Sequence, residues 1–242
     1  MITQDHLQGH WQRDWIKAPG FSDHTTRVHW MQAGAVFADL RIPLDRPDLA
    51  GFACLGDVPH PALAQLLTSE GFAGRITVEH SKCTWHRSIN WQGVPGQPDV
   101  GLMSFDGAGG LIEEGVLATY TELWQQVPQS PLRGSRLRNG GLSGVLIEND
   151  DVFMLGIGAP PGGSTEALQN ALRSGTALTA DLMRCFESEY VMGRWDGPLG
   201  VAQLSTQPLH EGQVAVERST TGMIWHALAF DGGTCARRLT VA

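Results

Sequence analysis

Residues 25–43 read TTRVHWMQAGAVFADLRIP, and this stretch decides the fold class of the chain. Two runs rich in β-branched and aromatic residues flank Ala33-Gly34, and Pro43 closes the second run. Strand-forming runs on either side of a short glycine-containing turn are typical of a β-hairpin. The stretch therefore predicts two antiparallel strands joined by a tight turn.

Both faces of this predicted hairpin mix apolar with polar side chains. Because side chains alternate along a strand, pairing through the turn groups one set of residues on the first face: Val28, Trp30, Phe37, Asp39 and Arg41. The other face carries Arg27, His29, Met31, Val36, Ala38, Leu40 and Ile42. A barrel strand has this pattern when one face lines a partly polar interior and a neighbouring element covers the other. Asp39 and Arg41 are then candidate partners for a buried charge.

A second hairpin is predicted over residues 72–93, FAGRITVEHSKCTWHRSINWQG. A turn at Ser81-Lys82 separates a polar face from a mostly apolar one, which carries Ile76, Val78, His80, Cys83, Trp85, Arg87, Ile89 and Trp91. Trp85 and Trp91 are expected in the wall of any cavity that the barrel contains. Arg87 projects into the same apolar face and needs a partner, because an unpaired buried charge is costly.

The same order of elements returns in the second half of the chain. Helical spacing predicts a short helix in residues 62–71, ALAQLLTSEG, and another in residues 164–175, STEALQNALRSG, with Ser164 as its cap. A further strand pair is predicted over residues 182–197. A polar, glycine-rich segment begins near residue 128, so we predict two units, 1–128 and 129–242.

The composition supports short strands and tight turns. The chain has 30 glycines and 13 prolines among its 242 residues, more than a helical bundle would carry. Antiparallel strands with one interposed helix, used twice, fit two barrel units. We therefore predict an all-β protein with two short helices, built as two antiparallel barrels by internal duplication.

The first predicted strand contains Gly9-His10-Trp11, and Trp15 is expected on the same face as Trp11. This G-x-W pattern resembles that of the lipocalin and calycin barrels. In that family the tryptophan closes one end of the barrel and is often covered by an arginine from a late strand. The order of elements also resembles tandem lipocalin-like two-barrel proteins known from fungi. The resemblance implies two lipocalin-like barrels, although the second half has no clear G-x-W.

Charge and cysteine content narrow the classes of function. The 17 Lys plus Arg and 25 Asp plus Glu give a formal net charge of −8, which disfavours nucleic acids and anionic membranes as partners. The sequence shows no run of about 18 apolar residues and no signal-peptide pattern at its start. The four cysteines are scattered without a C-x-x-C, so free thiols and a cytoplasmic location are expected.

Two interpretations of Arg87 are open. It is either a structural residue, stacked on Trp11 or paired with Asp39 or Glu122, or an anchor whose guanidinium binds an anionic ligand. Arg194 has the same two interpretations by the same strand alternation.

No motif commits the chain to a reaction. His80 and Cys83 share a strand face, but His86 points to the opposite one, and a tetrahedral metal site needs three or four ligands. No G-x-S-x-G locates a nucleophile. We therefore predict no catalytic residue, no metal and no cofactor.

The leading functional hypothesis is non-enzymatic binding of a small apolar or amphipathic, and in one version anionic, molecule in a barrel cavity. The predicted ligand contacts are Trp11, Trp85, Arg87, Trp91 and Arg194. The alternatives are a structural or protein-interaction module with filled barrels, whose partner would be another protein, and a barrel-based enzyme. A tryptophan-lined cavity would favour the ligand-binding function. An exposed apolar patch would favour the protein-interaction module, and converging titratable groups would favour the enzyme.

Overall fold

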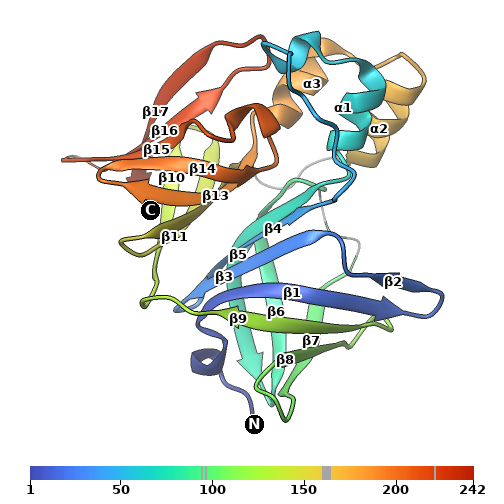
Figure 1. The fold of residues 1–242 in the computed structure, drawn as a ribbon, viewed down its shortest axis with the longest axis vertical. Coiled ribbons are helices and arrows are strands. Elements are labelled where there is room, and N and C mark those ends of the chain that lie inside the picture. The colour runs from blue at the N-terminus through green and yellow to red at the C-terminus, as the bar shows by residue number, and fades with distance from the viewer. Residues whose placement is uncertain (94, 96, 160–164, 221) are drawn as a thin grey trace.

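Two antiparallel β-barrels follow one another along the chain and pack against each other (Figure 1). The computed structural model describes residues 1–93, 95, 97–159, 165–220 and 222–242. The predicted all-β, two-barrel fold is confirmed. Within these ranges no helix is both long enough and apolar enough to cross a membrane.

The first barrel closes where its first strand pairs with its last. Its strands are β1 (Gly9–Ala18), β3 (Arg27–Ala33), β4 (Val36–Ile42), β5 (Glu70–Glu79), β6 (Lys82–Asn90), β7 (Asp99–Phe105), β8 (Leu111–Gly115) and β9 (Thr121–Val127). A short strand, β2 (Phe21–Asp23), extends the sheet beside β1. Closure pairs the first and last strands, which would otherwise be the edges of an open sheet.

The second barrel repeats this plan and closes by pairing its first strand with its last. Its strands are β10 (Arg133–Asn139), β11 (Leu142–Glu148), β12 (Val152–Gly158), β13 (Glu189–Asp196), β14 (Leu199–Ser205), β15 (Val214–Ser219), β16 (Gly222–Leu228) and β17 (Thr234–Val241). In each barrel the helices lie between the third and the fourth barrel strand. The two halves therefore share one order of elements.

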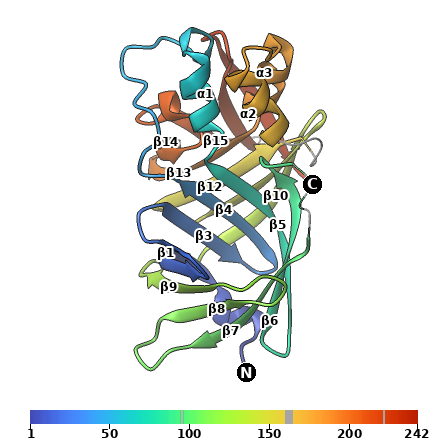
Figure 2. The same ribbon diagram turned by 90° about the vertical axis from the view of Figure 1, so that its right-hand side faces the viewer.

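The described residues form three short helices, which lie above the first barrel and beside the second (Figure 1, Figure 2). They are α1 (His60–Leu66), α2 (Thr165–Arg173) and α3 (Thr179–Phe186), and single 3₁₀ turns form η1 (Gln4–Leu7), η2 (Leu55–Asp57) and η3 (Pro208–His210). Their apolar side chains join the outer faces of β3–β6 and β11–β14 in one shared core. Each barrel interior holds a separate core of its own.

The helices differ from the prediction in two places. α1 ends at Leu66, and Gly71, expected at its end, already belongs to β5. α3 occupies residues for which a strand was predicted. Leu182 and Phe186 are buried and four residues apart, so a helix turns both toward the shared core. The predicted cap Ser164 lies outside the described residues.

The face assignment of the first hairpin is confirmed, although its turn lies at Gly34-Ala35, one residue later than predicted. Trp30 faces the interior of the first barrel. Leu40, on the opposite face, packs in the shared core. A shift of the turn by one residue on both sides leaves the strand parity unchanged, so each side chain keeps its face.

A β-bulge overturns part of the second hairpin. Its turn lies at His80-Ser81, and the register of β6 shifts between its pairings with Ala73 and Gly74. Trp91, predicted on the inward face, therefore packs outside the barrel in the shared core. A Cβ on Gly74 would lie 2.0 Å from the backbone oxygen of a β6 residue, so the bulge needs glycine there.

A second bulge interrupts β1. Its pairing with β9 shifts between Arg13 and Trp15, so Trp15 does not share the inward face of Trp11 as predicted. Ile16 lines the interior in its place. Both errors have one cause: an extra residue in a strand reverses the inside and outside positions beyond it.

Candidate functional site

The interior of the first barrel changes from apolar at one end to charged at the other. The inward side chains of β4 show the change, since Phe37 belongs to the apolar core while Asp39 and Arg41 line a cavity. At the apolar end, the N-terminal segment contributes Ile2 and Leu7 to the buried core. The barrel therefore has a packed end and a polar end.

Trp11 lies in the packed part of this interior. Its indole N–H donates a hydrogen bond to the backbone oxygen of Leu7 at 2.9 Å. Its ring stacks on Trp30, with 6.3 Å between ring centres, and Phe105 lies 6.4 Å away. These rings stand where the lipocalin resemblance implied a covering arginine.

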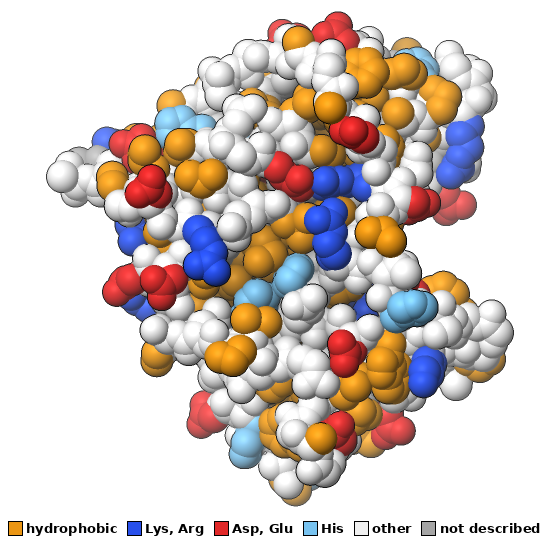
Figure 3. Space-filling view, viewed as in Figure 1, with side chains coloured by type: hydrophobic (Ala, Val, Ile, Leu, Met, Phe, Trp, Pro, Cys, Tyr) orange, Lys and Arg blue, Asp and Glu red, His pale blue; other side chains and the backbone are white. Residues whose placement is uncertain are grey.

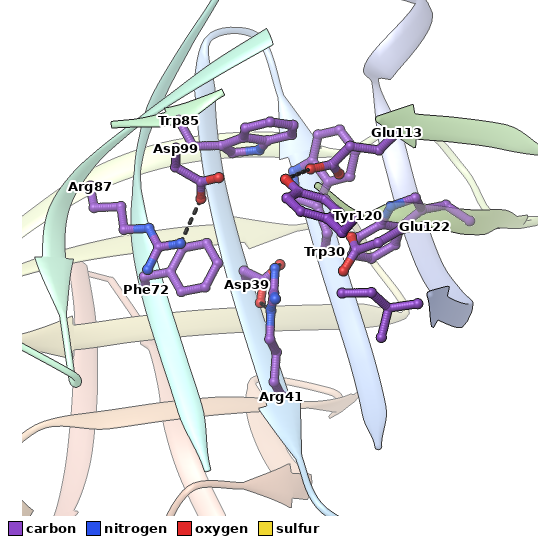
Figure 4. A pocket seen from close by; sticks show the side chains of 12 residues that line it. Trp30, Asp39, Arg41, Phe72, Trp85, Arg87, Asp99, Glu113, Tyr120 and Glu122 are labelled. Carbon is purple, nitrogen blue, oxygen red and sulfur yellow. Dashed lines mark hydrogen bonds and ion pairs between the residues drawn. The ribbon is translucent and has the colours of Figure 1, made fainter. Parts of the chain in front are cut away.

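A cavity of about 210 Å³ lies at the charged end of the first barrel (Figure 4). Its lining residues are Ile16, Trp30, Asp39, Arg41, Phe72, Trp85, Arg87, Asp99, Glu113, Tyr120, Glu122 and Trp124. The wall thus combines aromatic rings with both acidic and basic groups. Apolar surfaces that surround a few convergent polar groups are typical of ligand sites.

Two arginines of the wall are paired with carboxylates that face the cavity. Arg41 binds Asp39 at 2.8 Å, and Arg87 binds Asp99 at 2.5 Å (Figure 4). The Arg87 guanidinium also lies 3.5 Å from the centre of the Phe72 ring, a cation–π contact. Burial raises the pKa of Asp39, and the Arg41 charge opposes that rise. Arg87 therefore has an internal carboxylate partner, although a different one from those that the sequence suggested.

A third arginine at this end of the barrel is Arg13 of β1. Arg13 binds Glu122 at 2.7 Å and Asp23 at 3.1 Å, and its side chain is only 6% exposed. The guanidinium therefore compensates the Glu122 carboxylate that lines the cavity.

Glu113 of β8 is different, because no arginine or lysine of the described residues forms an ion pair with it. The Tyr120 hydroxyl donates a hydrogen bond to its Oε1 at 2.7 Å, and Glu113 is 4% exposed. Burial, together with the nearby carboxylates of Glu122 and Asp99, raises the pKa of Glu113 well above its ordinary value of 4.5. The Glu113 carboxyl group therefore stays protonated to a higher pH than an exposed one.

Two glycines leave the space that Glu113 and Tyr120 occupy. A Cβ on Gly101 would lie 2.6 Å from Cγ of Glu113, and one on Gly115 would lie 2.4 Å from the Tyr120 ring. Real Cβ atoms do not approach other atoms so closely, so any larger residue would displace the pair. The local sequence of β7 and β8 thus fits this arrangement.

Several donors at the cavity wall lack acceptors. Trp30 and Trp124 are each 1% exposed and line the cavity. Their indole N–H groups and the Nε–H of Arg87 have no hydrogen-bond partner among the described residues. Buried donors are nearly always satisfied, so these three groups are exceptions within the wall of the barrel.

The structure gathers only part of the predicted contact set. Trp85 and Arg87 line the cavity, and Trp11 lies deeper in the same barrel. Trp91 lies outside that barrel in the shared core. Arg194 is an exposed residue of β13 in the second barrel, far along the chain from the cavity strands.

Asp99, Glu113 and Tyr120 line the cavity but were not predicted from the sequence. One signal was available for Glu113: strand alternation places it on the same face as Leu111, which is fully buried in the barrel interior. Asp99 and Tyr120 stand at strand ends, where the sequence gives no register.

The interior of the second barrel is packed with apolar side chains around the buried pair of Glu189 and His210. Glu189 accepts hydrogen bonds from Ser205 at 2.7 Å, His210 at 2.7 Å and the Trp225 indole at 3.0 Å. All four side chains are buried. Because Ser205 and Glu189 are fully buried, the hydroxyl is closed to a substrate from solvent, and we assign the group a structural role.

An open hollow of about 510 Å³ lies between the loop of residues 44–52 and the η3 turn of the second barrel. Figure 3 shows basic side chains among apolar ones on this face of the molecule. Arg46 crosses it to bind Glu211 of the second barrel at 2.8 Å. Across the described ranges, no group of three or more His, Cys, Asp or Glu side chains is arranged to hold a metal ion.

The fold has a counterpart of known structure. The crystal structure of an uncharacterized protein of Saccharomyces cerevisiae, YLR301w, matches this chain with a TM-score of 0.56 and 11% identity. The match covers 98% of each chain. Such low identity shows the fold alone. No protein family model and no curated protein matches the chain. The chain is thus a tandem β-barrel protein, and this fold by itself assigns no function.

Proposed function

We propose that the chain binds a small amphipathic molecule in its first barrel without transforming it. The single observation behind this proposal is the cavity that lies between tryptophan rings and charged groups. Such a wall suits a ligand with an apolar body and one polar end. Because Arg87 is already paired with Asp99, its guanidinium is a weaker anchor for an anion than a free one.

We propose further that both barrels are lipocalin-like units, formed by residues 1–128 and 129–242 and related by internal duplication. The eight-stranded closure of each barrel, the η1 turn before β1 and the buried Trp11 support this. The four cysteines are all unpaired, which fits a reducing compartment such as the cytoplasm.

The second barrel has a structural role in this proposal. Its interior is packed by apolar side chains, and its outer face joins β3–β6 of the first barrel in the shared core. Light scattering coupled to size-exclusion chromatography, with and without candidate protein partners, tests whether it also serves an interaction.

An enzyme is the second candidate, because several titratable groups converge in the same cavity. Glu113, with its raised pKa, has the property required of a general acid. The two functions differ in what becomes of the bound molecule. A binder returns its ligand unchanged after long incubation, and mass spectrometry of the released molecule distinguishes the two.

Native mass spectrometry of freshly purified protein is expected to show a retained small molecule or, after stripping, the uptake of one. Trp30, Trp85 and Trp124 line the cavity, so occupancy is also expected to change the intrinsic fluorescence. A protein that retains no molecule and whose fluorescence responds to no member of a panel of amines, alcohols, carboxylates, lipids and haem would refute the binding function.

The double substitution Arg87→Met/Asp99→Asn is expected to weaken ligand binding about tenfold while the barrel stays folded. It removes both partners of one cavity ion pair, so neither charge is left buried alone. Fluorescence titration measures the affinity, and circular dichroism measures the fold. Arg133→Met/Asp150→Asn, which removes an exposed pair of the second barrel, is the control and should leave affinity unchanged. If the cavity variant unfolds, the role of Arg87 is structural.

A further inference from the structure

Among the carboxyl groups that line the cavity, Glu113 is the one without an arginine or lysine partner in the described residues. Asp39 pairs with Arg41, and Asp99 pairs with Arg87. Glu122 pairs with Arg13, which also binds Asp23. The hydrogen-bond partner of Glu113 is the neutral Tyr120 hydroxyl. A buried carboxylate without a cation is costly, so this position either keeps a proton or receives a positive charge from a ligand.

The surroundings of Glu113 suit a cation. Tyr120 and the tryptophans of the wall, Trp30, Trp85 and Trp124, place aromatic rings around the same cavity. Ring faces attract ammonium groups, most strongly where water is excluded. Tyr120 occupies Oε1 of Glu113, which leaves Oε2 as an acceptor for an N–H donor.

We propose that the ligand of the first barrel is a small monocationic amine whose ammonium group binds Glu113 and whose body lies against the tryptophans. This inference rests on the proposed binding function. The cavity of about 210 Å³ corresponds to about seven water molecules in liquid volume, so the ligand has on the order of ten non-hydrogen atoms.

Binding of the ammonium group exchanges one cation for another. Below the pKa of Glu113, which burial and the carboxylate neighbours raise, the Glu113 carboxyl group of the empty protein holds a proton. When R–NH₃⁺ binds, that proton passes to the solvent and the carboxylate pairs with the ammonium, so charge and atoms balance. The groups that act on Glu113 come from four other elements: Arg41 of β4, Cys83 of β6, Asp99 of β7, and Tyr120 and Glu122 at β9.

The proton exchange fixes a pH dependence. Below the raised pKa of Glu113, each bound amine releases up to one proton, so amine affinity rises by up to tenfold per pH unit. Arg41 opposes a cation, but its charge is compensated by Asp39 at 2.8 Å. The rise ends where Glu113 is already ionised in the empty protein.

Three probes of matched size and different charge test the proposal on the full chain: 2-phenylethylamine, 2-phenylethanol and phenylacetate. The amine is expected to bind at least tenfold more tightly than the other two at pH 7. Calorimetry in phosphate and in Tris, buffers with different ionisation heats, is expected to report the release of up to one proton. Smaller amines such as butylamine extend the series if the cavity excludes the ring.

Glu113→Gln supplies the decisive variant, because glutamine is a neutral isostere that still accepts the Tyr120 hydroxyl. Amine affinity is expected to fall roughly 10- to 100-fold, and the proton release to vanish, while weak binding of the alcohol remains. Glu114→Gln is the matched control, since Glu114 is the adjacent exposed residue and loses the same charge. Gly101→Ala, which pushes against Cγ of Glu113, should weaken amine binding as well.

Failure takes two distinguishable forms. If phenylacetate or 2-phenylethanol binds as tightly as the amine, or if Glu113→Gln leaves amine affinity unchanged, the ligand class is wrong while the binding function stands. If no amine binds but native mass spectrometry shows another retained molecule, the proposed ligand class is again wrong and the binding function again stands. If no probe binds and nothing is retained, the binding function falls as well.

Discussion

Replacing Glu189 with leucine is expected to lower the free energy of unfolding by about 3–5 kcal/mol. Glu189 is fully buried and accepts hydrogen bonds from Ser205, His210 and Trp225. Leucine removes the acceptor for all three, so buried donors and a buried histidine lose their partner. The second barrel should therefore be weakened at its centre.

Electrostatics supports a large effect. Burial alone would raise the pKa of Glu189, but His210, with the Ser205 and Trp225 hydrogen bonds, holds that pKa below its ordinary value. Burial likewise disfavours the charged form of His210, yet Glu189 raises the pKa of His210. Glu189 and His210 therefore form an ion pair in the folded state. Removing the Glu189 charge leaves the His210 charge buried without a partner.

Urea unfolding followed by circular dichroism measures the loss. Glu217→Leu is the matched control, because Glu217 also pairs with a histidine of the same barrel, His226 at 3.3 Å, but is partly exposed. An exposed pair contributes about 1 kcal/mol or less, so the control should stay near the parent. Equal losses in the two variants would contradict the buried-pair explanation.

Lowering the pH from 7 to 5 is expected to reduce the free energy of unfolding by about 2–4 kcal/mol, because His10 and His29 resist protonation in the folded state. Nε2 of His10 lies 3.0 Å from Nδ1 of His29, and both rings are largely shielded from water. Burial, then the His29 charge, lowers the pKa of His10 to about 3. Burial, then the Arg27 charge, lowers the pKa of His29 to about 4.

The sign follows from these pKa values. In the unfolded chain both histidines take up protons as the pH falls below about 6.5, whereas in the folded chain they do so only near pH 3–4. Stability linked to this pair is therefore complete above pH 6.5 and is lost as the pH falls toward 4. Each histidine accounts for up to about 2 kcal/mol at pH 5.

A double variant isolates this contribution. Glu113 acts in the opposite direction, because its raised pKa makes the folded state relatively more stable as the pH falls toward 4.5. The slope of unfolding free energy between pH 7 and 5 should thus be compared between the parent and His10→Gln/His29→Gln. The exposed His24→Gln keeps the parent slope. If the double variant also keeps it, the two histidines do not carry the effect.

Most of the fold follows from local patterns in the sequence. Alternation in residues 27–42 placed Trp30, Asp39 and Arg41 on one face, and the structure keeps them there. This succeeded because a strand has a period of two residues, so parity survives a small error in the turn position. The helix α3 was missed because its buried pair, Leu182 and Phe186, also fits a strand when read without its neighbours.

The site was only partly visible in the sequence. Strand alternation predicts that Arg87 lies inside the barrel, where the structure has it. The cost of a buried charge predicts that Arg87 has a partner. Its partner, Asp99, stands on β7, across a connection that no local pattern fixes. Trp91 lies outside the predicted cavity wall, because a bulge in β6 exchanges the inward and outward side-chain positions beyond it.

The sequence by itself therefore determined the strands, the two-barrel class and the inward faces as far as each strand stays regular. Only the tertiary structure decided where the bulges fall, how β1 meets β9 and which charges meet inside. The physical reason is that alternation is a local property of the backbone, whereas closure and ion pairing depend on contacts between residues distant in the chain. Glu113 shows the difference. Strand alternation is enough to predict that its side chain points inward, but whether an arginine or lysine pairs with it depends on every strand around it.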